Sequence, residues 1–132
     1  MGLLMRLSIP LLLAFSLVLP GTVQAADLSG HWQRENGQAQ IAFAPCPGGQ
    51  SKGVCGTIAW LNPAVKTKAR IGDKVFYDLV PDGANNWKGK AYSPREGKTY
   101  AATLKFEGAT LYSRECLFGD RICRSETWTR VK

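Results

Sequence analysis

The feature that most constrains the fold is a series of short runs in which apolar and polar residues alternate between turn residues. A period of two is typical of half-buried β-strands, because successive side chains of a strand point to opposite faces. After residue 25, no stretch of helical length shows the 3.6-residue period of an amphipathic helix. The runs are Ser29–Glu35, Gln38–Ala44, Val54–Leu61, Lys74–Val80, Trp87–Tyr92, Thr99–Phe106, Ala109–Cys116 and Cys123–Val131. The sequence therefore predicts an all-β domain of eight strands in series.

Most links between these runs are short, and several carry strong turn signals such as Asn36-Gly37. Short links favour antiparallel neighbours. An open sheet of eight strands would leave two unpaired edges. Closing the sheet removes both edges and forms a barrel of the size that can hold one small ligand. We therefore expect an antiparallel up-and-down eight-stranded barrel, with a two-sheet sandwich as the alternative.

The N-terminus has the order of a secretory signal peptide. One positive charge, Arg6, precedes the apolar stretch 7–19, and the small-residue site Val23-Gln24-Ala25 follows. The alternative is a membrane anchor, but the apolar stretch is much shorter than the roughly 20 residues that span a bilayer. We expect cleavage after Ala25, a single domain over residues 26–132 with no transmembrane segment, and a periplasmic or secreted location.

All four cysteines lie after the predicted cleavage site, at Cys46, Cys55, Cys116 and Cys123. An even number in an exported chain indicates two disulfides, with three possible pairings. Each sequential pair brackets a strand, a loop and a strand, so we predict Cys46–Cys55 and Cys116–Cys123. A metal site would favour closer cysteine spacing and histidine. Since His31 is the only histidine, no metal is expected.

The chain is basic, with a formal net charge of +7. One local concentration, Lys66, Lys68, Arg70 and Lys74, falls in a probable loop and could attract an anionic envelope surface. The remaining charges are scattered, which also fits simple solubility. We expect no nucleic-acid partner.

Two motifs at opposite ends of the domain suggest how the barrel closes. Gly30-His31-Trp32 opens the first predicted strand, and Trp128-Thr129-Arg130 lies in the last. In a closed barrel these strands are neighbours, so Arg130 could stack on Trp32 in a cation–π contact of about 0.5–2 kcal/mol. A Gly-x-Trp with a late Arg resembles the structural signature of lipocalins. We expect Gly30, Trp32 and Arg130 to have this structural role.

A longer ordered set of motifs covers essentially all of residues 26–132. It comprises Gly30-His31-Trp32, Pro45-Cys46, Val54-Cys55-Gly56-Thr57-Ile58, Pro81-Asp82-Gly83, Trp87-Lys88-Gly89, Tyr92-Ser93-Pro94, Gly97-Lys98-Thr99-Tyr100 and Glu126-Thr127-Trp128-Thr129-Arg130. In this order the motifs resemble the exported bacterial family catalogued as domain of unknown function 2147. The resemblance implies a lipocalin-like barrel, an exported or periplasmic location and no established activity or catalytic residues.

The chain departs from that family pattern in two places. The link from Leu61 to Asp78 is short and lacks an Asp- and Asn-containing segment, and Glu115 stands before Cys116 where Gly is expected. The resemblance therefore does not carry over a ligand site in that link.

The inward positions of the predicted barrel mix small and aromatic residues. Such a mixture can line a cavity, or it can interdigitate and fill a narrow barrel. The small residues are Gly89, Ala91 and Ala102, and the aromatic ones are Trp60, Trp87, Tyr100 and Phe106. We take Trp60, Trp87 and Tyr100 as candidate contacts for a small apolar or amphiphilic ligand.

No catalytic constellation is visible in the sequence. His31 has no evident partner for acid–base chemistry, and the chain lacks Gly-x-Ser-x-Gly, phosphate-loop and dinucleotide motifs. We expect a binding protein without a cofactor rather than an enzyme. The alternative is a cell-envelope interaction module that binds a protein or an anionic surface through its exterior.

Overall fold

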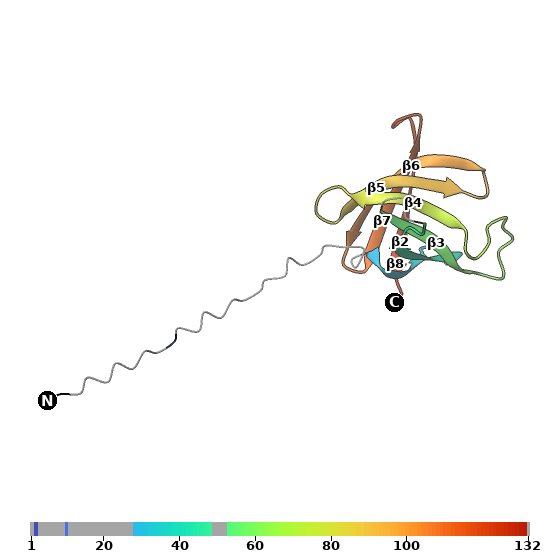
Figure 1. Cartoon of the computed structure of the whole chain (residues 1–132). Helices are drawn as coiled ribbons and strands as arrows, with labels where there is room; N and C mark the ends of the chain where they lie inside the picture. The colour runs from blue at the N-terminus through green and yellow to red at the C-terminus, as the bar shows by residue number, and fades with distance from the viewer. Residues whose placement is uncertain (1, 3–9, 11–27, 49–52, 132) are drawn as a thin grey trace.

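In a computed structural model, the chain forms one closed β-barrel (Figure 1). The structure describes residues 2, 10, 28–48 and 53–131. The strands are β1 (Gly30–Arg34), β2 (Ala39–Pro45), β3 (Val54–Leu61), β4 (Lys74–Pro81), β5 (Asn86–Ser93), β6 (Lys98–Glu107), β7 (Thr110–Leu117) and β8 (Ile122–Arg130). Each strand pairs antiparallel with the next, and β8 pairs with β1. The predicted antiparallel eight-stranded barrel is confirmed.

The predicted signal segment lies outside the described residues, apart from Gly2 and Pro10. The division into residues 1–25 and 26–132 therefore stays a prediction. Within the part of the chain that the structure describes, no helix is both long and apolar enough to cross a bilayer.

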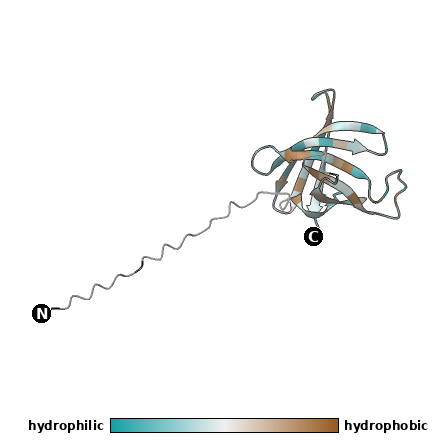
Figure 2. Cartoon of the chain, in the orientation of Figure 1, coloured by the Kyte–Doolittle hydropathy of each residue, from teal (hydrophilic) through white to brown (hydrophobic). Residues whose placement is uncertain are grey.

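Because the strands run up and down in order, alternate links lie at the same end of the barrel. We call the links 35–38, 62–73, 94–97 and 118–121 the open rim. The opposite end carries the β2–β3, β4–β5 and β6–β7 links together with Leu28 and Ser29, and we call it the closed end. Hydrophobic and hydrophilic residues alternate along the strands (Figure 2), as expected when one face packs inward and the other meets water.

The closed end is sealed by the segment that precedes β1. Leu28 and Trp32 are fully buried, and Trp32 Nε1 donates to the carbonyl oxygen of Leu28 at 2.8 Å. The Arg130 guanidinium lies 4.2 Å from the centroid of the Trp32 ring and donates to the Ser29 carbonyl oxygen at 2.6 Å. Trp32 and Arg130 are also paired across β1 and β8. The contact expected from the two terminal motifs is therefore present, and Gly30 begins β1 with a φ of 95°.

An aromatic layer crosses the middle of the barrel. Phe43 and Phe76 have ring centroids 5.8 Å apart, and Phe76 meets Trp128 edge-on at 6.2 Å. Gly56 permits this packing, since a Cβ there would lie 2.8 Å from the Phe43 ring. Ala91 and Ala102 belong to the same buried core, so these small residues help to fill the barrel.

The prediction that Trp60 points inward is wrong. Ile41 pairs with Ile58 while Gln40 pairs with Trp60, so Ala59 is an extra residue in β3. Such a β-bulge shifts the alternation of side chains by one. Trp60 consequently joins Gln40 on the outer face, where it is 37% exposed, and Leu61 takes the inward position beside Ala39.

Both predicted disulfides are present, one at each end of the barrel. Cys46–Cys55 joins β2 to β3 at the closed end. Cys116–Cys123 joins β7 to β8 next to the open rim. The local pairing is confirmed, and it is compatible with an exported protein because disulfides persist in oxidising compartments.

Candidate functional site

The barrel interior is hollow toward the open rim. A cavity of about 340 Å³ lies there, at the lower end of the roughly 300–1,000 Å³ typical of small-molecule pockets. Phe76 and Trp128, from the aromatic layer, form its floor. The cavity is therefore closed below by packed rings and open above between the loops.

One side of the cavity is apolar, and we call it the apolar wall. Its members come from β2, β3, the 62–73 link and the start of β4, which are consecutive in the barrel. They are Ala39, Ile41, Ile58, Leu61, Val65, Ala69 and Val75. Such a surface can contact hydrocarbon but offers no side-chain hydrogen bonds.

The opposite side carries five charged side chains, and we call it the ionic wall. It consists of Arg34 of β1, Glu96 of the 94–97 link, Glu115 of β7, and Arg124 and Glu126 of β8. In β8, Arg124, Glu126, Trp128 and Arg130 occupy the inward positions in alternation. Charged groups lie inside the barrel here because β8 extends past the apolar core toward the open rim, and its alternate side chains still point inward.

Arg124 is the centre of the ionic wall. Its Nε donates to Glu115 Oε2 at 2.6 Å, and its Nη1 donates to Glu96 Oε1 at 2.7 Å. Its guanidinium also lies 4.3 Å from the centroid of the Tyr100 ring. The Glu115 side chain is only 7% exposed, so Arg124 neutralises a carboxylate that would otherwise be buried alone.

Tyr100 completes this cluster by donating its hydroxyl proton to Glu96. The bond lowers the pKa of Glu96, with a further contribution from Arg124, and it raises the pKa of Tyr100. The network links the 94–97 turn to β6, β7 and β8. Glu96 is thereby held as a carboxylate at the edge of the cavity.

A second ion pair joins Arg34 to Glu126. The Arg34 guanidinium lies 6.0 Å from the centroid of the Trp128 ring, just above the cavity floor. Burial raises the pKa of Glu126, and the positive charge of Arg34 partly offsets that effect. The pKa values of Glu96 and Glu126 thus shift in opposite directions. Hydrogen bonding has the larger effect at Glu96, and desolvation has the larger effect at Glu126.

Two further cations, Lys66 and Arg95, line the mouth of the cavity from the 62–73 and 94–97 links. Both side chains are exposed. Neither takes part in an ion pair among the described residues. The mouth is therefore positively charged, whereas the charges of the ionic wall are paired with one another.

None of the three candidate ligand contacts lines this cavity. Trp60 is on the outer face. Tyr100 is buried beneath Arg124 and supports the ionic wall from behind. Trp87 is buried and borders a second, more open hollow of about 610 Å³, whose lining includes Thr103 and Ser113. Lys66, Lys68 and Arg70 of the basic cluster are exposed in the 62–73 link, as expected for a loop. Lys74 is also exposed, but it is the first residue of β4.

The ionic wall was not predicted from the sequence. The sequence pattern that could have revealed it is in β8, where Arg124, Glu126 and Trp128 alternate with Ser125 and Thr127. That spacing puts the two charged residues on the same face as a buried tryptophan. Arg34 stands in the same relation to Trp32 in β1.

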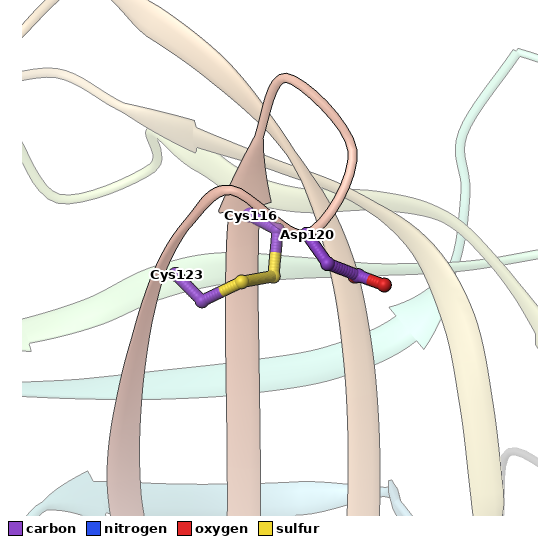
Figure 3. Close-up of side chains that lie close together, drawn as sticks. All are labelled: Cys116, Asp120 and Cys123. Carbon is purple, nitrogen blue, oxygen red and sulfur yellow. A yellow bond between two sulfur atoms is a disulfide. The ribbon is translucent and has the colours of Figure 1, made fainter.

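The described residues contain one group with metal-ligand chemistry, Cys116, Asp120 and Cys123, whose ligand atoms lie within 4.8 Å of one another (Figure 3). The two sulfurs are joined in a disulfide, and metal binding requires free thiolates. His31 pairs with Ala42 on the outer face of the sheet, away from the cavity. The arrangement at the open end offers ion pairs and apolar surface, with each carboxylate of the ionic wall bonded to an arginine.

Residues 30–130 match the family described as "Uncharacterized protein conserved in bacteria (DUF2147)". No curated protein and no solved structure matches the chain significantly. The family match spans all eight strands, from Gly30 of β1 to Arg130 of β8. It includes the ionic wall and both disulfides, and the chain belongs to this bacterial family.

Proposed function

We propose that this protein is an exported carrier that binds a small amphiphilic molecule in the open end of its barrel, and that it is not an enzyme. The single observation that supports the proposal is the cavity with two unlike sides. An amphiphile has the same division between hydrocarbon and polar groups. Its hydrocarbon part would lie along the apolar wall and over the Phe76 ring.

The polar part of the ligand would face the ionic wall and the mouth. Lys66 and Arg95 can donate hydrogen bonds to the ligand without first breaking an ion pair among the described residues. The paired charges of the ionic wall offer both donors and acceptors in fixed positions. A few placed polar groups in a mainly apolar pocket are the usual basis of orientation and specificity.

The proposal that the protein is not an enzyme rests on the hydrogen bonds that the carboxylates of the ionic wall already accept. Glu96 and Glu115 both accept hydrogen bonds from Arg124, and Glu126 is bonded to Arg34. A general base must instead reach a proton of the substrate. The two disulfides support the exported location, since such bonds are rare in reducing compartments.

The experiment that tests the carrier function fills the cavity from the apolar wall. Ala39→Phe places a ring in the hollow, and Ala101→Phe adds the same ring to the outer face, where Ala101 is exposed. The probes are N-phenyl-1-naphthylamine, which is neutral, and dansylaminoundecanoic acid, which is an anionic amphiphile. We expect Ala39→Phe to weaken binding of the amphiphile by about tenfold or more, equivalent to about 1.4 kcal/mol.

Ala101→Phe should bind the probes like the wild type. Equal weakening by both substitutions would mean that the probes bind elsewhere, and failure of the wild type to bind either probe would end the carrier proposal. Native mass spectrometry of protein isolated from its own envelope complements this test. An adduct that is lost on denaturation would begin to identify the cargo.

A second candidate function is favoured by the exposed basic cluster Lys66, Lys68, Arg70 and Lys74. In this reading the protein is an envelope interaction module that binds an anionic surface or a protein through its exterior. Reversing all four charges should abolish the association, whereas Lys88→Glu with Lys105→Glu on the barrel wall should not. Unchanged association after the first set would exclude the cluster.

A further inference from the structure

We propose that the open rim is a docking face for an anionic lipid bilayer, with Phe118 at the tip of the β7–β8 hairpin as its apolar anchor. This surface is distinct from the basic cluster alone, because it combines exposed apolar side chains with the cations around them. The hairpin projects beyond the neighbouring strands (Figure 1). Its tip is therefore free to meet a surface before the barrel wall does.

Phe118 is unusual in two respects. It is 76% exposed, the highest value among the large apolar residues described. Its φ is +55°, in the left-handed region that bulky side chains rarely adopt. Since the side chain is mostly in water, neither property contributes to packing of the barrel. Strained, exposed conformations that packing does not explain are typical of functional positions.

The hairpin that carries Phe118 is firmly held. Cys116–Cys123 links β7 to β8 directly below the tip (Figure 3), and Leu117 pairs with Ile122 above the disulfide. A rigid hairpin loses little conformational entropy when its tip inserts into a bilayer. The tip therefore has the properties of an anchor.

Other parts of the open rim also carry exposed apolar side chains next to cations. Ile122 at the hairpin and Ile71 in the 62–73 link are 56% and 67% exposed. Exposed cations accompany them on three of the four links: Lys66, Lys68 and Arg70, then Arg95, then Arg121. The carboxylates on the same links are Asp73, Glu96 and Asp120. Glu96 is already bonded to Arg124, and Asp73 accepts a hydrogen bond from the backbone amide of Arg70. With Glu35 in the 35–38 link, the open rim carries five cations and four carboxylates, a small positive excess, together with separate apolar projections.

This composition fits a lipid surface better than a protein partner. The apolar projections come from two separate links, Phe118 and Ile122 from the β7–β8 hairpin and Ile71 from the 62–73 link. Protein interfaces instead typically have one continuous hydrophobic patch. A bilayer requires no shape complementarity. It accepts separate apolar side chains at the level of its head groups while anionic lipids attract the surrounding lysines and arginines.

Docking in this orientation would turn the mouth of the cavity toward the bilayer. If the carrier function proposed above holds, an amphiphile could pass between the membrane and the apolar wall without crossing water. The docking face itself does not depend on that function, because none of its apolar anchors lines the cavity.

The test is co-sedimentation of the purified, disulfide-intact protein with vesicles of phosphatidylcholine alone or mixed with phosphatidylglycerol. The key variant is Phe118→Asn, because asparagine tolerates a positive φ and should leave the fold intact. The matched control is Val131→Asn, which removes an exposed apolar side chain at the closed end. Far-ultraviolet circular dichroism of both variants checks the fold.

We expect the wild type to bind the anionic vesicles and not the neutral ones. Phe118→Asn should weaken that binding by about tenfold, and Val131→Asn should leave it unchanged. Equal binding by the wild type and Phe118→Asn would overturn the anchor, as would no binding to anionic vesicles. Binding of the Phe118 variant to N-phenyl-1-naphthylamine without vesicles separates the two proposals, because loss of docking alone leaves it intact.

Discussion

The two ends of the barrel contain the same contact but differ in what surrounds it. At the closed end the Arg130 guanidinium lies 4.2 Å from the Trp32 ring centroid, and at the open end Arg124 lies 4.3 Å from that of Tyr100. Arg130 bonds to a backbone carbonyl beside the fully buried Leu28. Arg124 bonds to two carboxylates beside a cavity.

This difference separates an end that is packed shut from an end that opens into a cavity. At the closed end, the guanidinium of Arg130 between the Trp32 ring and a backbone carbonyl completes the packing around an apolar core. A guanidinium between a ring and two carboxylates keeps a polar surface inside the barrel, and buried ion pairs of this kind contribute little to stability. The open end has therefore retained charges that folding alone does not require.

The largest effect expected from this comparison is at the closed end. Trp32→Ala should lower the free energy of unfolding by about 3–5 kcal/mol, because it leaves a large void among fully buried residues. Trp60→Ala, on the outer face, should change it by well under half of that. Urea denaturation followed by circular dichroism measures both, and similar losses would contradict the distinction between an inner and an outer tryptophan.

The two disulfides provide the next comparison. Their sequence separations are 9 and 7 residues, so replacing either pair by alanine should cost about 2–3 kcal/mol in the chain-entropy model. Only the Cys116→Ala and Cys123→Ala pair should also weaken vesicle binding, because that disulfide holds the Phe118 hairpin. If the Cys46–Cys55 pair proved equally important for docking, the assignment of separate roles to the two ends would fail.

A double-mutant cycle on Arg124 and Glu115 sharpens the comparison further. Arg124→Met leaves Glu115 buried without its partner and should cost about 1–3 kcal/mol. Adding Glu115→Gln should recover much of that loss, giving a clear coupling energy. Arg130→Met with Glu115→Gln serves as the uncoupled control. Additive losses for Arg124 and Glu115 would mean that the carboxylate is already well solvated.

The smallest effect expected is a pH dependence at Glu126. Its pKa is raised above 4.5 in the folded protein, so the native state binds this proton more tightly than the unfolded chain. The resulting stability is fully present below the unfolded value and is lost as pH rises through the folded-state pKa. Between about pH 4 and pH 8, wild type should lose stability relative to Glu126→Gln. A constant difference in urea denaturation would contradict this direction.

Most of the fold could be predicted from the sequence because the barrel is built from local signals. Alternation located all eight strands to within a few residues, and the spacing of the cysteines indicated the correct disulfides. The two terminal motifs indicated the Trp32–Arg130 closure, because only one neighbour remains for the first strand once the sheet closes.

The candidate site was harder to predict because it depends on exceptions to alternation. The extra residue Ala59 reversed the orientation of Trp60, and nothing in the local composition marks the bulge. The charged residues of β8 would ordinarily be expected to face solvent. Their inward orientation becomes evident only when the alternation of side chains is counted back from the buried Trp128. Tyr100 was correctly expected inside the barrel, but its partner Glu96 comes from a turn that sequence patterns do not place in space.

The bulge in β3 has a spectroscopic consequence. Of the four tryptophans, Trp32, Trp87 and Trp128 are buried, whereas Trp60 faces outward near the open rim. The chain therefore carries one indole whose emission responds to whatever approaches that rim, alongside three that report on the packed interior. Bound membrane would shift the first signal to shorter wavelength and leave the others unchanged, so docking and unfolding can be distinguished in the unlabelled protein.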